Sequence, residues 1–388
     1  MRNMKQANID GLSRFFNQVY TLNGYTVPEG PKYIATTEQE KVYLKKSKII
    51  EQARLTPRLS MASCDFLNNR YIMAWGEDIN AEAVDPDLLI FCDENAALIT
   101  ILLAETSIGL KRGVHPLAIV DEIYSQHTQP GYKGYDFSDI AKFLEPRFLF
   151  KVPKSSIFVG ADLYQIGCYL IASTDDCINL PFSHLLQAAY RDVIISTQRK
   201  ISYENISQSL TCISWKHCYL ELYRCIERLF PISYLSQMKQ DLGIANSLLE
   251  IASNLENTIS WRPKEEEALK RLMDVCDETL RSRMKALLPK TQAPAAKEGP
   301  SAPVPEQIEA TPPAAFVNSN AADEDDPENP MTKKFAGYIY KIRNQIVHFR
   351  AAHEKIDLSD ELWNTILALQ LHIIQFLYNN FDAEINPS

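Results

Sequence analysis

The feature that most constrains the fold is a change in hydrophobic periodicity about half-way along the chain. From about Ser207 onward, apolar residues recur every three or four positions through most of the C-terminal half, which is the pattern of amphipathic helices. Before that point, helical patterns alternate with short strand-like runs. We therefore predict an α+β protein of two domains, a mixed α/β domain over residues 1–200 and an all-α helical bundle over residues 201–388.

The N-terminal half is expected to mix helices and strands. Helical patterns occur at Ile9–Tyr20, Asn95–Leu110, Pro116–Gln126 and Phe182–Thr197. Strand-like runs occur at Lys41–Ile50, Arg70–Ala74, Asp87–Cys92, Arg147–Val152 and Ser156–Val159, with Gln165–Ala172 as a weaker candidate. No phosphate-binding glycine loop or nucleophile elbow is found among them. The sequence of this half therefore gives no support for an ATPase or a serine hydrolase.

The C-terminal half is expected to be a bundle of helices. A first helical region begins near Ser209 or Thr211, either of which can cap it, and Pro231 stops it after Phe230. The helical regions that follow are Ser233–Leu255 with a possible break at Gly243, Lys264–Leu287 and Ser359–Phe381. Their apolar faces predict one shared core.

A proline-rich segment over residues 289–330 interrupts this bundle. It holds nine of the 21 prolines of the chain, set among Ala, Glu and Asp, and such a composition predicts disorder. Residues 288–332 carry eight carboxylates and two lysines, a charge of −6, which leaves −3 for the remainder of a chain whose net charge is −9. We expect the acidic end of this segment, Asp323–Glu328, to fold over the cationic helix that follows it.

That cationic helix is predicted over residues 333–350. Its apolar residues follow helical spacing, and it holds no carboxylate. The apolar positions are Phe335, Tyr338, Ile339, Ile342, Ile346 and Phe349. The cationic positions are Lys333, Lys334, Lys341, Arg343 and Arg350. A cationic helix face suits a phosphate-bearing partner, and we predict that Lys334, Lys341 and Arg350 contact RNA.

Within this helix, Arg343, Asn344 and His348 are candidate catalytic residues. A His takes or gives a proton near neutral pH, an Arg fork holds phosphate oxygens, and an Asn amide orients either group. On an ideal helix Arg343 points about 140° away from His348, although its side chain is long enough to bend back. The alternative is structural: Arg343 and Lys341 solvate a surface, Asn344 bonds locally and His348 packs at the helix end.

The stretch 333–350 resembles the signature helix of the HEPN superfamily, whose motif is Arg, commonly followed by Asn, and then His after four to six residues. Arg343, Asn344 and His348 match that motif. The stretch Trp215–Phe230 also resembles the first helix of such domains. The resemblance covers about residues 205–384.

This resemblance implies a helical bundle that pairs with a second copy. In active members, two Arg-x-x-x-x-His motifs meet across a homodimer to form a metal-independent endoribonuclease site without a cofactor. His348 is then the acid/base, Arg343 the phosphate clamp and Asn344 the orienting group. Such domains occur in bacterial toxin and anti-phage systems, so the implied function is RNA cleavage in the cytoplasm that halts growth.

The resemblance also leaves alternatives open. Many relatives are inactive, so a second interpretation is a non-catalytic module that binds a nucleotide, RNA or a protein. A third is a toxin-like half silenced by a separate antitoxin. If the C-terminal half is an effector, the N-terminal domain is expected to sense a trigger or dock a partner.

Other candidate chemistry is weaker. Asp85, Asp87, Asp93 and Glu94 flank a predicted strand and could hold a divalent metal, but a solvated turn is the simpler interpretation. Tyr124, Tyr132, Tyr135 and Phe137 could form a recognition loop or pack beneath one. The eight cysteines form no Cys-x-x-Cys pair, which favours reduced thiols over a zinc site or disulfides. No apolar run is long enough to predict a membrane span.

Overall fold

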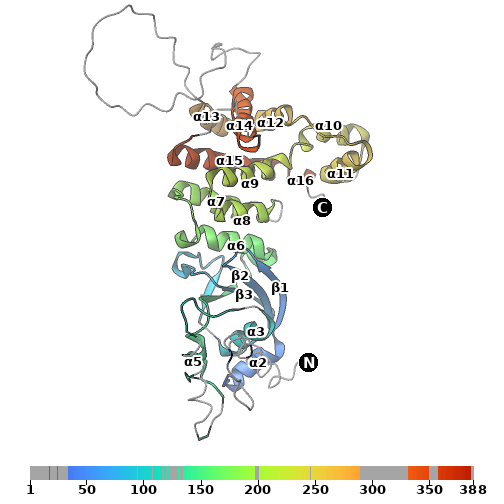
Figure 1. Cartoon of the computed structure of the whole chain (residues 1–388). Coiled ribbons are helices and arrows are strands. Elements are labelled where there is room, and N and C mark those ends of the chain that lie inside the picture. The colour runs from blue at the N-terminus through green and yellow to red at the C-terminus, as the bar shows by residue number, and fades with distance from the viewer. Residues whose placement is uncertain are drawn as a thin grey trace, which may run out of the picture. The chain divides into compact units, whose positions relative to one another are not determined.

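The computed structural model in Figure 1 has an α+β fold. It describes residues 34–115, 134–196, 201–288, 331–348 and 357–385 apart from 94, 107 and 245, together with residues 17, 24, 118, 121, 122, 130 and 131. The chain divides into two compact units, Met1–Asn179 and Leu180–Ser388. The sequence predicted this division at residue 200, and the structure places it earlier in the chain. The reason is that helix α7 (His184–Ser196) packs on α15 (Asp360–Asn380) of the second unit.

The first unit is built on a five-stranded antiparallel sheet with the strand order β1-β2-β3-β5-β4. Its strands are β1 (Lys48–Arg54), β2 (Ser60–Phe66), β3 (Asn69–Trp75), β4 (Ile90–Cys92) and β5 (Arg147–Val152). The predicted strands at the positions of β3, β4 and β5 are confirmed, although β4 is shorter than predicted. The sequence prediction missed β2, because most of its residues are buried on both faces and the strand lacks polar alternation.

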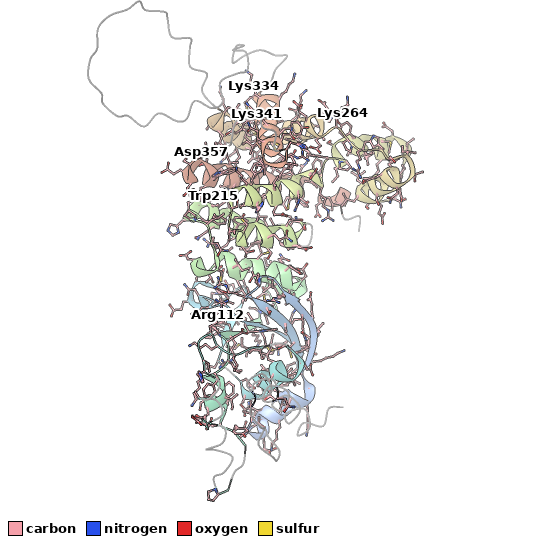
Figure 2. The ribbon with its side chains drawn as sticks, viewed as in Figure 1. Arg112, Trp215, Lys264, Lys334, Lys341 and Asp357 are labelled. Atoms are coloured by element: carbon pink, nitrogen blue, oxygen red, sulfur yellow. The ribbon has the colours of Figure 1, made fainter. Side chains whose placement is uncertain are left out.

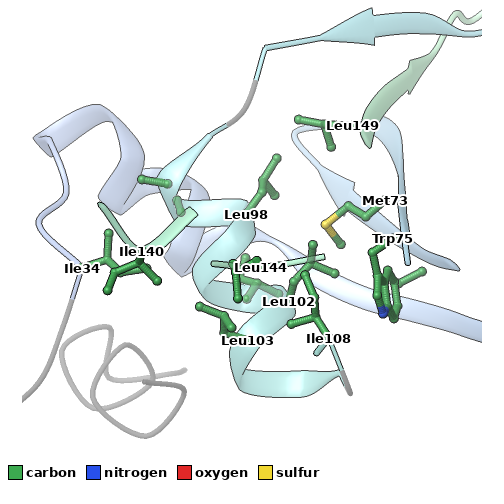
Figure 3. Close-up of a cluster of buried hydrophobic side chains, with 14 of the residues drawn as sticks. Ile34, Met73, Trp75, Leu98, Leu102, Leu103, Ile108, Ile140, Leu144 and Leu149 are labelled. Atoms are coloured by element: carbon green, nitrogen blue, oxygen red, sulfur yellow. The ribbon is translucent and has the colours of Figure 1, made fainter. Parts of the chain in front are cut away.

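Helices cover both faces of this sheet. On one face, α3 (Ala96–Glu105) packs Leu98 and Leu102 into a core that includes Met73 and Trp75 (Figure 3). On the other face, α6 (Leu163–Ala172) packs on β1 and β2. Gly167 of α6 permits this approach, since a Cβ atom there would lie 1.8 Å from the Leu55 side chain. Successive residues of the strands therefore enter two different apolar layers.

Three predicted strands in this unit are wrong in whole or in part. The N-terminal part of Lys41–Ile50 is helix α2 (Glu38–Lys46), which begins with a capping box formed by Thr37 and Glu40. Ser156–Val159 is mostly part of a 3₁₀ turn, η2 (Ile157–Gly160). Gln165–Ala172 is helix α6, whose residues are nearly all buried, so its apolar run has no helical periodicity to distinguish it from a buried strand.

The other predicted helices of this half have mixed outcomes. Asn95–Leu110 is confirmed as the shorter α3, with Asn95 as its N-cap. The predicted helix Ile9–Tyr20 lies outside the described residues except for residue 17, and most of Pro116–Gln126 also lies outside them. The remaining short elements are η1 (Ala81–Ala83), α5 (Phe137–Ala141) and η3 (Asp175–Cys177).

The second unit is helical, as predicted. Besides α7 and α15, it contains α8 (Tyr203–Thr211), α9 (Trp215–Glu227), α10 (Ile232–Leu242), α11 (Leu248–Ile259), α12 (Glu265–Val275), α13 (Glu278–Leu287), α14 (Met331–Val347) and α16 (Asp382–Ile385). The predicted break at Gly243 is confirmed: α10 ends just before it, and its φ of +63° favours glycine. The proline-rich segment 289–330 and its acidic end lie outside the described residues.

The long helix α15 lies at the centre of the second unit. It packs on α7, α9 and α13, while α14 packs on α9, α12 and α13 (Figure 1). Tyr378 of α15 donates a hydrogen bond to the backbone carbonyl of Cys225 on α9 at 3.0 Å, inside this core. Among the described helices, none combines the length and apolar composition needed to cross a bilayer.

Gly76, which follows β3, provides a test of the sheet's packing. Its φ is +101°, and a Cβ atom there would lie 1.9 Å from the backbone oxygen of Arg58. We expect Gly76→Ala to lower the free energy of unfolding of the first unit by about 2 kcal/mol or more, because backbone must move. The control Gly113→Ala, with a φ of +79° and no atom nearby, should cost about 1 kcal/mol. Urea denaturation with hydrogen–deuterium exchange of β2 and β3 measures both; equal losses would contradict the steric argument.

Candidate active site

The candidate site lies at the C-terminal end of α14. This helix buries Phe335, Ile339 and Ile342 along one face, as its apolar spacing predicted. Two polar contacts join it to α12. Thr332 near its start donates a hydrogen bond to Asp274 near the end of α12, and Arg343 near its end contacts Glu265 in the first turn of α12. The two helices are therefore antiparallel, and the C-terminal end of α14 meets the N-terminal end of α12.

Helix α9 supports α14 from another side. Tyr219 is fully buried and donates a hydrogen bond to the backbone oxygen of Ile339 at 2.7 Å. One turn further along α9, Tyr223 is also buried, and its hydroxyl has no hydrogen-bond partner among the described residues. Burial raises the pKa of the Tyr219 phenol well above its usual value and raises that of Tyr223 too. Both phenols are therefore neutral near physiological pH.

Arg343 connects the groups of the site. Its Nη1 donates to Asn344 Oδ1 at 3.0 Å and lies 3.5 Å from His348 Nε2. Its Nη2 donates to Glu265 Oε1 at 3.2 Å. The Arg343 side chain is 17% exposed and that of Glu265 is 33% exposed. The guanidinium is thus held on both branches while one side remains open to solvent.

The three predicted catalytic residues are therefore brought together. Arg343 and His348 meet although they lie five positions apart, because α14 ends at Val347 and His348 is already beyond the last helical residue. The His348 backbone N–H still donates to the Asn344 carbonyl at 2.9 Å, which places the exposed imidazole at the helix terminus. The negative end of the α14 dipole favours positive charge there.

Two carboxylates that lie far apart in the sequence interact with this guanidinium, one directly and one through its charge. Glu265 forms the direct ion pair, and its Oε2 is buried without a hydrogen-bond partner among the described residues. Glu227, at the end of α9, is half-buried; burial raises its pKa, the nearby charge of Glu265 raises it further, and Arg343 opposes both effects. The sequence alone did not connect Glu265 with the motif, since no local pattern links residues 78 positions apart.

The geometry suits proton transfer beside a bound anion. A guanidinium only donates hydrogen bonds, so a hydrogen bond between Arg343 and His348 makes Nε2 the acceptor and places the imidazole proton on Nδ1. The one lone pair of a neutral imidazole in this state lies on Nε2, and it becomes free to accept a proton from a hydroxyl group when Arg343 turns its Nη1 hydrogen to a phosphate oxygen. The adjacent guanidinium is placed to hold the negative charge that develops on a phosphate.

The predicted RNA-binding residues are only partly described. Lys334 and Lys341 lie on α14, where Lys341 is exposed and Lys334 half-buried, and Lys264 stands just before α12 (Figure 2). Arg350 lies outside the described residues, as does Phe349. The cationic character predicted for the helix is therefore seen at two of the three positions.

The weaker candidates of the first unit do not form a site among the described residues. Asp85 Oδ1 accepts a hydrogen bond from the Asp87 backbone at 2.9 Å in an exposed turn. Among the described residues, no group of three potential metal ligands occurs. Glu94, one of the four candidates, lies outside the described residues. Tyr135 is fully buried in the core beside α3. Tyr124 and Tyr132 lie outside the described residues.

All eight cysteines, in both units, are free thiols. Cys218 is buried against the Tyr190 hydroxyl at 3.3 Å, and burial raises its pKa well above the usual value. It packs as a small apolar residue.

Comparison of the chain with protein-family models, with curated proteins and with solved structures found no match.

The two buried tyrosines of α9 provide a matched pair for measuring how α14 is held. Tyr219→Phe removes a buried hydrogen bond to α14 and should lower the free energy of unfolding of the second unit by about 1 kcal/mol. Tyr223→Phe removes a buried hydroxyl without a described partner and should be neutral or stabilising. Urea denaturation of both variants, followed by circular dichroism, measures the difference. A larger loss in Tyr223→Phe would show that its hydroxyl is paired.

The raised pKa of Glu227 predicts a pH-dependent stability difference. Between the ordinary glutamate value of 4.5 and its raised value in the folded state, Glu227 binds more protons folded than unfolded. The wild type therefore loses stability as the pH rises through this window. Glu227→Gln does not titrate, so we expect it to be more stable than the wild type at pH 7.5 and to lose that advantage near pH 4. Thermal unfolding across this range measures the effect; a pH-independent difference would contradict it.

Proposed function

We propose that the chain is a metal-independent endoribonuclease whose active site is formed by Arg343, Asn344 and His348. The observation that carries the proposal is the contact of one guanidinium with both the amide and the imidazole at an accessible helix end. The match of these residues to the HEPN motif supports it. Lys341 and Lys334 add positive charge along the same helix for the RNA backbone.

The proposed reaction begins with attack of a ribose 2′-hydroxyl on the adjacent phosphorus. His348 Nε2 accepts the hydroxyl proton, and Arg343 holds a non-bridging phosphate oxygen as negative charge grows. Asn344 accepts a hydrogen bond from the guanidinium and so keeps it beside the imidazole. A second acid must protonate the 5′-oxygen that leaves, and one chain presents only one such histidine in the motif. A homodimer that joins two copies of the motif provides that acid.

RNA cleavage that halts growth, in a toxin or anti-phage defence system of the cytoplasm, is the role implied by the HEPN resemblance. We propose that the first unit binds the trigger or an antitoxin, because it contributes no residue to the site described above. The alternative is a non-catalytic module that binds a nucleotide, RNA or a protein through α14. A cleavage assay distinguishes the enzyme from this module.

The test is RNA cleavage by the purified full chain in EDTA. We expect Arg343→Ala to lower the cleavage rate by about 10²–10³-fold and His348→Ala by about 10²–10⁴-fold, since each removes one part of the transition-state stabilisation. Arg283→Ala, which removes an exposed arginine from α13, should leave the rate unchanged.

Native mass spectrometry of each variant provides the control for assembly. Loss of cleavage with the dimer intact supports the composite site. A folded wild-type dimer that binds RNA but does not cleave it, with or without metal, contradicts the enzyme and favours the binding module.

A further inference from the structure

Arg343 is the only residue of the proposed motif that also contacts another helix of the bundle through a described ion pair. Its Nη1 faces Asn344 and His348, whereas its Nη2 donates to Glu265 Oε1 at 3.2 Å. An arginine side chain has several rotatable bonds and ordinarily loses substantial conformational entropy when it is fixed. Contacts at both branches determine the plane of the guanidinium and the direction in which Nη1 points.

Among the described residues, Arg343 is the ion-pair partner of Glu265. Its Oε2 is buried without a hydrogen-bond partner in the described part of the chain, so the Arg343 contact is the described ion pair that compensates its burial. It occupies the first residue of α12, where the positive end of the helix dipole favours a carboxylate. Glu266 and Glu267 beside it are exposed, and Glu267 pairs with Arg271. The position of Glu265 is thus distinct from those of its two acidic neighbours.

A second carboxylate interacts with the guanidinium through its charge. Glu227 approaches from α9, and its pKa is raised by burial and by the charge of Glu265. The carboxylate charges that act on Arg343 therefore come from two helices of the second unit, Glu265 on α12 and Glu227 on α9. The direct hydrogen bonds to this guanidinium come from Asn344 on α14 and Glu265 on α12.

We propose that Glu265 is a positioning residue that holds Nη2 of Arg343 so that Nη1 lies beside His348 Nε2 and turns one hydrogen from that nitrogen to the phosphate when RNA binds. This inference rests on the proposed ribonuclease function. Glu265 does not touch the RNA. Its carboxylate orients the Arg343 guanidinium before the substrate binds, so less conformational entropy is lost on binding. The same carboxylate also competes with the anionic substrate for Arg343.

The activity test separates orientation from binding. Glu265→Gln removes the charge but keeps the shape, so we expect kcat to fall by about 10- to 100-fold. KM for RNA should stay the same or fall, because a negative charge leaves the site while Arg343 remains. Glu265→Asp, with a carboxylate one methylene shorter, should recover part of kcat. The matched control Glu266→Gln removes the same charge from an exposed neighbour and should leave kcat unchanged.

Some outcomes overturn the inference even when the wild type cleaves RNA. These are an unchanged kcat in Glu265→Gln, an equal loss in Glu266→Gln, or a rise in KM with constant kcat. Circular dichroism of each variant at the assay temperature excludes loss of the fold as the cause. Each of these results leaves the ribonuclease proposal itself intact.

A second measurement does not depend on cleavage. In ¹⁵N-arginine-labelled full chain, a guanidinium held on both branches rotates slowly and gives separate Nη signals, assigned to Arg343 by their loss in Arg343→Lys. We expect these separate signals in the wild type and in Glu266→Gln, and a single averaged signal in Glu265→Gln. Averaged signals in the wild type would overturn the inference. Separate signals together with an absence of RNA cleavage would count against the ribonuclease alone.

Discussion

The burial of one face of α14 is the constraint on which the candidate site depends. Packing against other helices of the second unit positions this helix, which buries Phe335, Ile339 and Ile342. Its apolar face packs on α9 and α12, and polar contacts near both ends of the helix fix its register against α12. Apolar contacts are non-directional, whereas hydrogen bonds are directional. The placement of Arg343 and His348 therefore depends on residues such as Thr332 and Tyr219 that have no chemical role.

At the C-terminal end of α14, Glu265 attracts Arg343 and also competes with phosphate for it. The C-terminal end of α14 favours cations, the N-terminal end of α12 favours anions, and the Arg343–Glu265 pair satisfies both helix dipoles at once. Partial burial strengthens this pair relative to a surface ion pair. The same pair partly neutralises the cation that is proposed to hold phosphate. A site arranged in this way has an oriented clamp and a lower affinity for anions than an unpaired arginine would provide.

The sequence predicted different parts of the structure with unequal success. Amphipathic helices that cover a single core, such as α14 and α15, were predicted within a few residues, because one apolar face and one polar face leave a clear period. Elements buried on all sides were missed or mistaken, as with β2 and α6, because burial on every face removes the period. The error at α2 has another cause: strand-like residues outweighed the capping box of Thr37 and Glu40 that begins the helix.

The sequence by itself determined the α+β class and the helical nature of the second half, since each depends on patterns within one half of the chain, and its motif singled out Arg343, Asn344 and His348 as candidates. Only the tertiary structure decided that α12 and α14 are antiparallel, that Glu265 meets Arg343, and that Glu227 lies near both. One hydrogen bond and the charge interactions of Glu227 join residues on three helices that are distant in the sequence. Their proximity results from packing around a shared core, which no local periodicity encodes.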